Sequence, residues 1–142
     1  MEEDVLDQVP DFKLHKKATI TICIFLTGPL VGGFLIAENF RQLNERQNAV
    51  KTWIFTIAGT VLLFYLALFV PALEKLPGIV FPVVYTSIAS YFVQRYQEDK
   101  IKLHQKNGGQ FFPVWRAVLA SAVSLAVTFG LLYLAFYFAD QV

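Results

Sequence analysis

Charge is scarce in this chain, and it is absent from the stretches where an ion pathway would need it. Lysine, arginine, aspartate and glutamate make up 16% of the 142 residues, below the quarter that is typical of a soluble domain. None of them lies within the four apolar stretches 18–37, 52–70, 79–94 and 117–139. Because a charged side chain inside the bilayer marks most proton and ion pathways, this absence weighs against proton-coupled transport. The net charge of +1 also gives no basic surface for nucleic acid.

Cysteine and the common catalytic motifs are equally sparse. Cys23 is the single cysteine, so no intrachain disulfide can form. The sequence contains no nucleophile elbow, HExxH, CxxC or phosphate-binding loop. The two histidines, His15 and His104, are expected at opposite membrane surfaces, where they could not share a metal ion. We therefore expect a protein that is not an enzyme and that has no cofactor and no metal site.

Long apolar stretches dominate what remains. Each is close to the length of about 20 residues that crosses the hydrocarbon core as a helix. The sequence predicts an all-α integral membrane bundle of four transmembrane helices, preceded by a polar N-terminal tail over residues 1–17. The third helix is expected to continue into the aqueous phase as far as Asn107-Gly108-Gly109, a strong C-terminal stop. The four-helix domain covers 18–139, with spans at 18–38, 51–71, 78–95 and 114–139.

Small residues and one proline predict how these helices contact one another. Pro29 removes a backbone hydrogen bond from the first helix and should kink it at the middle of the membrane. Glycine and alanine at intervals of four residues allow membrane helices to approach closely. We expect the packing surfaces to include Gly28, Pro29, Gly32 and Gly33 on the first helix, and Ala122, Ala126 and Gly130 on the fourth, beside a second stripe of Ala120, Ser124 and Thr128.

The distribution of lysine and arginine predicts the orientation. With four spans, the first and third loops carry eight of these residues, and the opposite surface carries Lys13, Lys16, Lys17 and Lys75. Basic residues concentrate on the cytoplasmic side of membrane proteins. The bias places the two loops in the cytoplasm and both termini in the periplasm.

One cluster of charged residues could form a binding surface at the loop side. Glu38 should lie within salt-bridge reach of both Arg95 and Arg116, at the same depth, leaving an arginine free for a phosphate, a lipid headgroup or a protein partner. Ordinary interface chemistry explains the same residues, if Glu38 pairs with one arginine and the others contact lipid phosphates. The candidate cluster comprises Glu38, Asn39, Arg41, Arg95 and Arg116.

Uncharged hydroxyl side chains are the other polar feature of the predicted helices. They could line a pore or a small-molecule pocket, or they could form the interhelical hydrogen bonds that such residues commonly make in membranes. The set includes Thr27, Thr56, Thr60, Tyr65, Tyr85, Thr86, Ser87, Ser90, Tyr91, Ser121, Ser124 and Thr128.

Two sequence motifs resemble those of a known group of proteins. They are TGPLVGGFLIAENF over residues 27–40 and KNGG over residues 106–109, which precedes Trp115. The chain resembles small bacterial four-helix membrane proteins whose first helix has a Gly-Gly-Pro-Leu-Ala-Ala-Gly-Tyr-Leu pattern followed by Asn-Phe. It departs from that pattern at Thr27, which is glycine there, and at Gly32, which is often alanine. The resemblance implies a bacterial inner membrane and no catalytic residues.

These observations together favour a multi-pass membrane protein that acts by association. Its expected partners are the lipid bilayer, further copies of itself or a larger membrane complex, and anionic lipid headgroups. A small oligomeric channel or transporter for an uncharged or weakly charged solute is the alternative.

Overall fold

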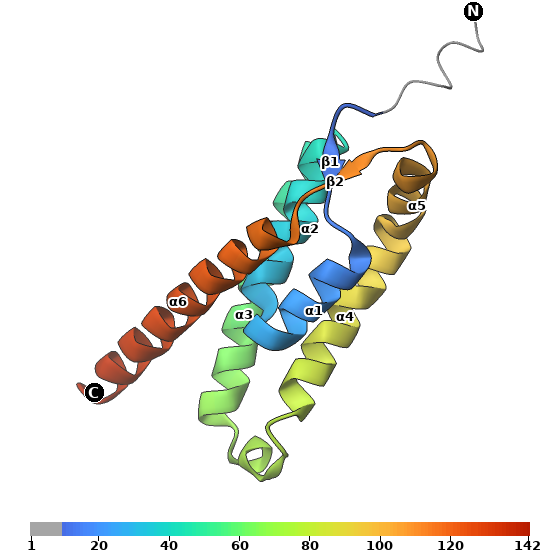
Figure 1. The fold of residues 1–142 in the computed structure, drawn as a ribbon. Coiled ribbons are helices and arrows are strands. Elements are labelled where there is room, and N and C mark those ends of the chain that lie inside the picture. The colour runs from blue at the N-terminus through green and yellow to red at the C-terminus, as the bar shows by residue number, and fades with distance from the viewer. Residues whose placement is uncertain (1–9) are drawn as a thin grey trace, which may run out of the picture.

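The computed structural model describes residues 10–142 and is mainly helical. A short strand β1 (Lys13–Leu14) leads into α1 (Lys17–Thr27) and α2 (Pro29–Gln42), and α3 (Arg46–Phe69) follows. A 3-10 turn, η1 (Pro71–Lys75), joins α3 to the antiparallel α4 (Val80–Tyr96). The chain then continues through α5 (Glu98–Lys106), β2 (Gln110–Phe111) and α6 (Val114–Ala139) (Figure 1). The all-α prediction is confirmed.

The single kinked helix expected over 18–38 is wrong. The chain forms two helices that fold back on each other at Gly28, whose φ of 103° lies in a region open to glycine. A residue before proline is disfavoured in the α conformation, and proline suits the first position of a new helix. Pro29 therefore begins α2 instead of kinking a longer helix. With 11 and 14 residues, α1 and α2 span only about 17 and 21 Å, too short to cross the hydrocarbon core.

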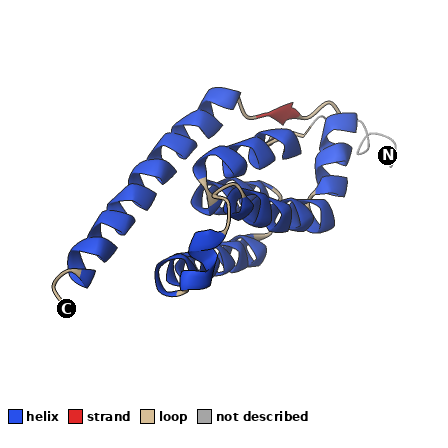
Figure 2. Cartoon of the chain, turned by 90° about the horizontal axis from the view of Figure 1, so that it is seen from below, coloured by secondary structure: helices blue, strands red, loops and turns tan. Residues whose placement is uncertain are grey.

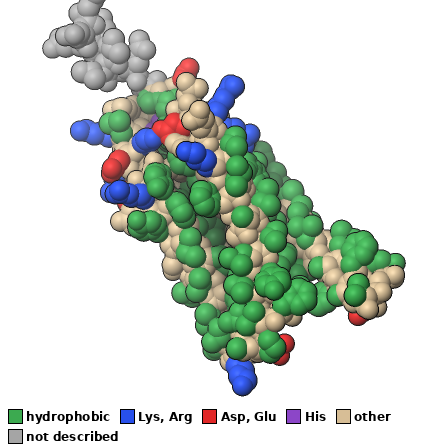
Figure 3. Space-filling model, turned by 180° about the vertical axis from the view of Figure 1, so that it is seen from behind, with side chains coloured by type: hydrophobic (Ala, Val, Ile, Leu, Met, Phe, Trp, Pro, Cys, Tyr) green, Lys and Arg blue, Asp and Glu red, His purple; other side chains and the backbone are tan. Residues whose placement is uncertain are grey.

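This hairpin brings the N-terminal segment to the same end of the molecule as the first and third loops. Lys13 and Leu14 pair in parallel with Gln110 and Phe111, just before α6. The expectation that residues 13–17 lie on the opposite surface is therefore wrong. Lysine and arginine side chains gather at this end, which we call the charged end (Figure 3). Of the twelve lysine and arginine residues in the sequence, the one exception is Lys75, which belongs to the η1 turn at the opposite end.

The charged end is built by tight helix stops. Asn44 has a φ of 61° and ends α2, with Glu45 N–H donating to the Phe40 carbonyl and Asn44 N–H to that of Arg41. That pattern is a Schellman motif, and the next residue, Glu45, is the N-cap of α3. Gly108, with a φ of 75°, ends α5 in the same way, as the sequence predicts. The long third helix is interrupted at Gln97, between α4 and α5.

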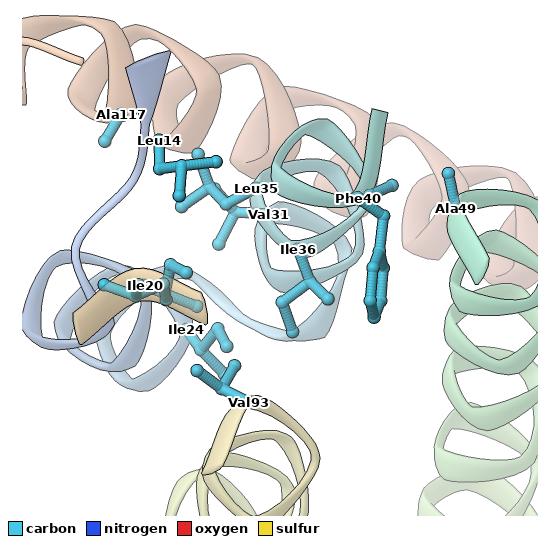
Figure 4. Packing of buried hydrophobic residues seen from close by; sticks show 12 residues of the cluster. Leu14, Ile20, Ile24, Val31, Leu35, Ile36, Phe40, Ala49, Val93 and Ala117 are labelled. Carbon is cyan, nitrogen blue, oxygen red and sulfur yellow. The ribbon is translucent and has the colours of Figure 1, made fainter. Parts of the chain in front are cut away.

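The hydrophobic core surrounds the α1–α2 hairpin. Ile20 and Ile24 of α1 face Leu35 of α2 and Val93 of α4, while Leu14 of β1 lies beside Ala117 of α6 (Figure 4). A Cβ on Gly32 would lie 2.7 Å from the Ile24 side chain, and one on Gly33 would lie 2.5 Å from Thr56 of α3. These two glycines therefore let α2 lie directly against α1 and α3.

The long helices, in contrast, expose their apolar surfaces. Both α3 and α6 are long and apolar enough to cross a membrane, and only 6% and 11% of their most apolar stretches are buried. A core helix of a soluble protein would be mostly buried, so the low values favour contact with lipid. Seen from below, α6 stands apart from the other helices (Figure 2). It packs on α1 and α2 through Ala117, Ser121 and Ser124.

The four-residue stripes on α6 divide between two environments. Ser124 is buried and Ala120 packs against the core, as expected for one stripe. Ala122, Ala126 and Gly130 are exposed, so they contact no other helix of the same chain, and their predicted role in helix packing is left to a second chain. Gly28, likewise, has no atom near its missing side chain. Gly28 allows the chain to reverse direction between α1 and α2, and it does not form a helix-packing pair with Gly32.

Candidate functional site

A buried polar cluster joins the N-terminal segment, the end of α2 and the start of α6. Glu38 is 6% exposed, and one of its carboxylate oxygens lies 2.7 Å from Nε2 of His15. The other oxygen accepts a hydrogen bond from the guanidinium of Arg116. Both carboxylate oxygens of Glu38 therefore have ion-pair partners. Glu38 is part of a closed ion-pair network and is not free to act as a general base.

Asn39 fixes the position of His15 through the backbone. Its side-chain oxygen accepts from the His15 N–H at 2.7 Å, and its Nδ2 donates to the His15 carbonyl at 3.1 Å. One amide side chain thereby satisfies both main-chain polar groups of a residue that is 1% exposed. The imidazole is held against Glu38 as a consequence.

Gln97 connects this cluster to the junction of α4 and α5. Its side chain is fully buried, accepts from Asn39 Nδ2 at 3.2 Å and donates to the Ile36 carbonyl at 2.9 Å. A buried amide left without partners would cost about 1–3 kcal/mol, so these bonds make Gln97 a strong link between the hairpin and α4. The network thus ties together segments that are far apart in sequence.

Arg116 completes the cluster in the first turn of α6. Its guanidinium carbon lies 4.5 Å from the centre of the Phe112 ring, in cation–π geometry. The same ring lies 4.6 Å from the ring of His15. The half-exposed guanidinium of Arg116 thus contacts both the Glu38 carboxylate and the Phe112 ring, and these contacts anchor the beginning of α6 to the α1–α2 hairpin.

The electrostatics of Glu38 follow from these contacts. Burial acts to raise the pKa of the carboxyl group, because it disfavours the charged form. Hydrogen bonds from His15 and Arg116, together with their charges, outweigh burial and hold the pKa below its ordinary value of 4.5. Glu38 is consequently an anion across the neutral range.

The structure brings together only part of the cluster expected from the sequence. Glu38, Asn39 and Arg116 meet, whereas Arg41 and Arg95 are exposed and form no ion pair within residues 10–142. The second partner of Glu38 is His15, which the sequence reasoning missed because it placed residues 13–17 at the other surface. The only local signal for the reversal is the Gly28-Pro29 pair, which fits a kinked helix equally well.

The other histidine lies at the same end, and the expectation of opposite surfaces is wrong for it. His104 is 3% exposed, its Nε2 lies 2.6 Å from the Gln110 carbonyl, and Phe12 stacks on its ring at 4.9 Å. A Cβ on Gly109 would overlap that ring, so glycine there makes room for the His104 side chain. Within the described residues no group of three histidine, cysteine or carboxylate side chains could hold a metal ion.

A cleft of about 500 Å³ opens between α3 and α4, which pack on α2 and α1 and diverge from each other. We call it the α3–α4 cleft. Residues of α2, including Gly33 and Ile36, form its floor. The rings of Phe55 and Phe92 face each other across it at 6.2 Å. Hydroxyl groups of Thr52, Thr56, Thr60 and Tyr85 also line it, and the last three belong to the polar set that the sequence left open between a pocket lining and interhelical hydrogen bonds.

Comparison with known proteins adds no assignment to this geometry: no family model, no curated protein and no solved structure matches the chain.

Proposed function

We propose that the chain is an integral membrane protein in which α3, α4 and α6 cross the bilayer and the α1–α2 hairpin enters it from one side without crossing. The exposed apolar surfaces of α3 and α6 support this arrangement. The 17 residues of α4 span about 26 Å, near the lower limit for a crossing helix. The polar cluster lies where α2 ends, so its charges stay at the membrane surface.

The charged end is the cytoplasmic side in this proposal. All lysines and arginines except Lys75 lie there, which is a much stronger asymmetry than the eight-to-four count from four spans. The N-terminal segment is then cytoplasmic and the end of α6 lies across the membrane. The resemblance to small bacterial membrane proteins supports an inner-membrane location.

The protein acts by association within the membrane, as one copy with another or as a small subunit of a larger complex. The observation that carries this proposal is the projection of α6. Beyond Ser124 no residue of α6 is buried, and the helix continues to Ala139 for about 22 Å. Its exposed stripe of Ala122, Ala126 and Gly130 lets a second helix approach closely, whereas glycine facing lipid contributes nothing to packing.

A self-association measurement tests the role of α6. Energy transfer between labelled copies in liposomes should show dimers or larger oligomers, and Gly130→Leu should weaken them by about tenfold by blocking close approach. Val127→Leu is the matched control, since Val127 is exposed on the same helix but outside the stripe. Equal energy transfer for Gly130→Leu and the parent would refute association through this stripe.

A channel or transporter for an uncharged solute is the second candidate, and the hydroxyl groups in the α3–α4 cleft favour it. Flux of a neutral solute such as glycerol into liposomes containing only this protein would support it. Flux equal to that of empty liposomes would exclude it for that solute.

A further inference from the structure

The α3–α4 cleft combines an apolar interior with a single charge at one end. Among residues 10–142, Lys51 is the only charged residue that lines it, and it lies at the end nearest the charged end of the molecule. We propose that the cleft binds one anionic glycerophospholipid, with its phosphate at Lys51 and one acyl chain along the cleft. This inference rests on the membrane placement proposed above and is independent of association through α6.

The anionic headgroup of the lipid is inferred from the ion-pair partners of the charged residues at this end of the cleft. Lys51 is exposed and forms no ion pair with any carboxylate in residues 10–142. The nearby acid, Glu45, is already bonded to Lys100 and to Asn48. An unpaired ammonium group at the membrane surface attracts a lipid phosphate, and the neutralised glutamate does not compete for it.

The tail is identified by the shape and chemistry of the interior. From Lys51 to Leu66 the cleft follows α3 for about 22 Å, between side chains such as Phe55 and Leu63 and the facing Ile88 of α4. Gly59 leaves open space, since no atom lies within 4 Å of a Cβ built there. The Thr60 hydroxyl is bonded to the Thr56 carbonyl at 2.7 Å, so it makes no demand on a ligand. The space therefore suits an alkyl chain that lies parallel to the helices.

A whole phospholipid explains the two features together. A helix from a second copy would fill the apolar space but would leave Lys51 without an anion. A zwitterionic lipid would supply the chain and a phosphate, but its own ammonium group would compete with Lys51. An anionic headgroup is the better electrostatic match to a lone lysine.

Lipid titration followed by native mass spectrometry of the detergent-solubilised full chain tests the proposal. The probes are phosphatidylglycerol and phosphatidylcholine with the same acyl chains. One phosphatidylglycerol per chain should bind first, with a preference of about fivefold over phosphatidylcholine, as a single partly exposed ion pair supplies. Gly59→Leu places a side chain in the cleft and should weaken binding by about tenfold.

Matched variants separate the cleft from general effects. Ala58→Leu adds an exposed side chain one residue away, outside the cleft, and should bind the lipid like the parent. Lys51→Gln should remove the preference for phosphatidylglycerol while Lys51→Arg keeps it. Arg46→Gln removes an exposed charge at the same end that does not line the cleft, and it should keep the preference.

Several outcomes would overturn the proposal. These are equal binding by Gly59→Leu and the parent, equal affinity of the parent for the two lipids, or a preference that survives in Lys51→Gln. A dimer that Gly59→Leu abolishes would show instead that a second copy occupies the cleft. If Gly59→Leu does not fold, the Lys51→Gln result decides alone. Loss of oligomers in Gly130→Leu with unchanged lipid binding would show that lipid binding in the α3–α4 cleft does not depend on association through α6.

Discussion

Glu38 near the end of α2 and Arg116 in the first turn of α6 form an ion pair across 78 residues of sequence. The carboxylate is buried and the guanidinium is about half exposed. With His15 on the other carboxylate oxygen, the pair fixes where α6 leaves the hairpin. Because the contacts of α6 end near Ser124, this pair is one of few features that set the direction of its free half.

Arg116→Ala should lower the free energy of unfolding by about 1–2 kcal/mol. Removing one partner of a fully buried pair costs about 3–5 kcal/mol, but here Arg116 is half exposed and His15 still compensates Glu38. Thermal unfolding in mild detergent measures the change. Arg95→Ala is the control, since that exposed arginine forms no ion pair in residues 10–142, and it should unfold like the parent. An equal loss in both variants would contradict a specific role of Arg116.

Acid should destabilise the protein partly through Glu38. Because the folded pKa lies below the ordinary value of 4.5, the stabilisation is fully present above about pH 4.5 and is lost as pH falls through the folded pKa. Melting temperature measured from pH 7 to pH 3 should fall less steeply in Glu38→Gln, which starts from a lower value at pH 7. Glu74→Gln, at an exposed site on η1, should follow the parent curve. Parallel curves for Glu38→Gln and the parent would contradict the prediction.

Gly33→Ala should destabilise the contact between α2 and α3. The new Cβ would lie 2.5 Å from the side chain of Thr56, so a helix or a side chain must shift, at a cost of about 1–3 kcal/mol. Gly130→Ala makes the same chemical change in open space. Higher helix propensity should leave that control as stable as the parent or up to about 1 kcal/mol more stable. The comparison uses thermal unfolding of the two variants, and equal melting temperatures would refute close packing at Gly33.

The two ends of the chain should report opposite sides of the membrane. A fluorescent protein that matures only in the cytoplasm should be bright when fused before Met1 and dark when fused after Val142. A periplasmic phosphatase reporter should give the reverse pattern. Matching signals from both ends would mean an even number of crossings and would refute the three-span arrangement.

Much of the helical content could be predicted from the sequence, because apolar length and terminal residues are local properties. The stop at Asn107-Gly108-Gly109 and the start of α6 after Pro113 are examples. The ion pair between Glu98 and Lys102, at 3.4 Å, also follows from their spacing on a helix. The pairing of Glu38 with Arg116 could be expected, because the sequence places both at similar distances from the ends of their apolar stretches.

The hairpin could not be predicted from apolar length, because 20 uncharged residues fit one crossing helix as well as two short ones. Which solution wins depends on contacts made elsewhere in the chain, such as those of Asn39 with His15 and Gln97. The local signal at Gly28-Pro29 is compatible with a kink as well as a reversal. The error at this one position moved the N-terminal segment, and with it His15, to the wrong surface.

The pairing of β1 with β2 also has a consequence for biosynthesis. Lys13 and Leu14 emerge early from the ribosome, but their partners Gln110 and Phe111 are made almost a hundred residues later. The α1–α2 hairpin is therefore synthesised before Gln97, β2 and Arg116, whose contacts complete its polar end. Until α6 begins, Glu38 has only His15 as an ion-pair partner among the described residues, so a contact from α6 completes a cluster whose other members are made earlier.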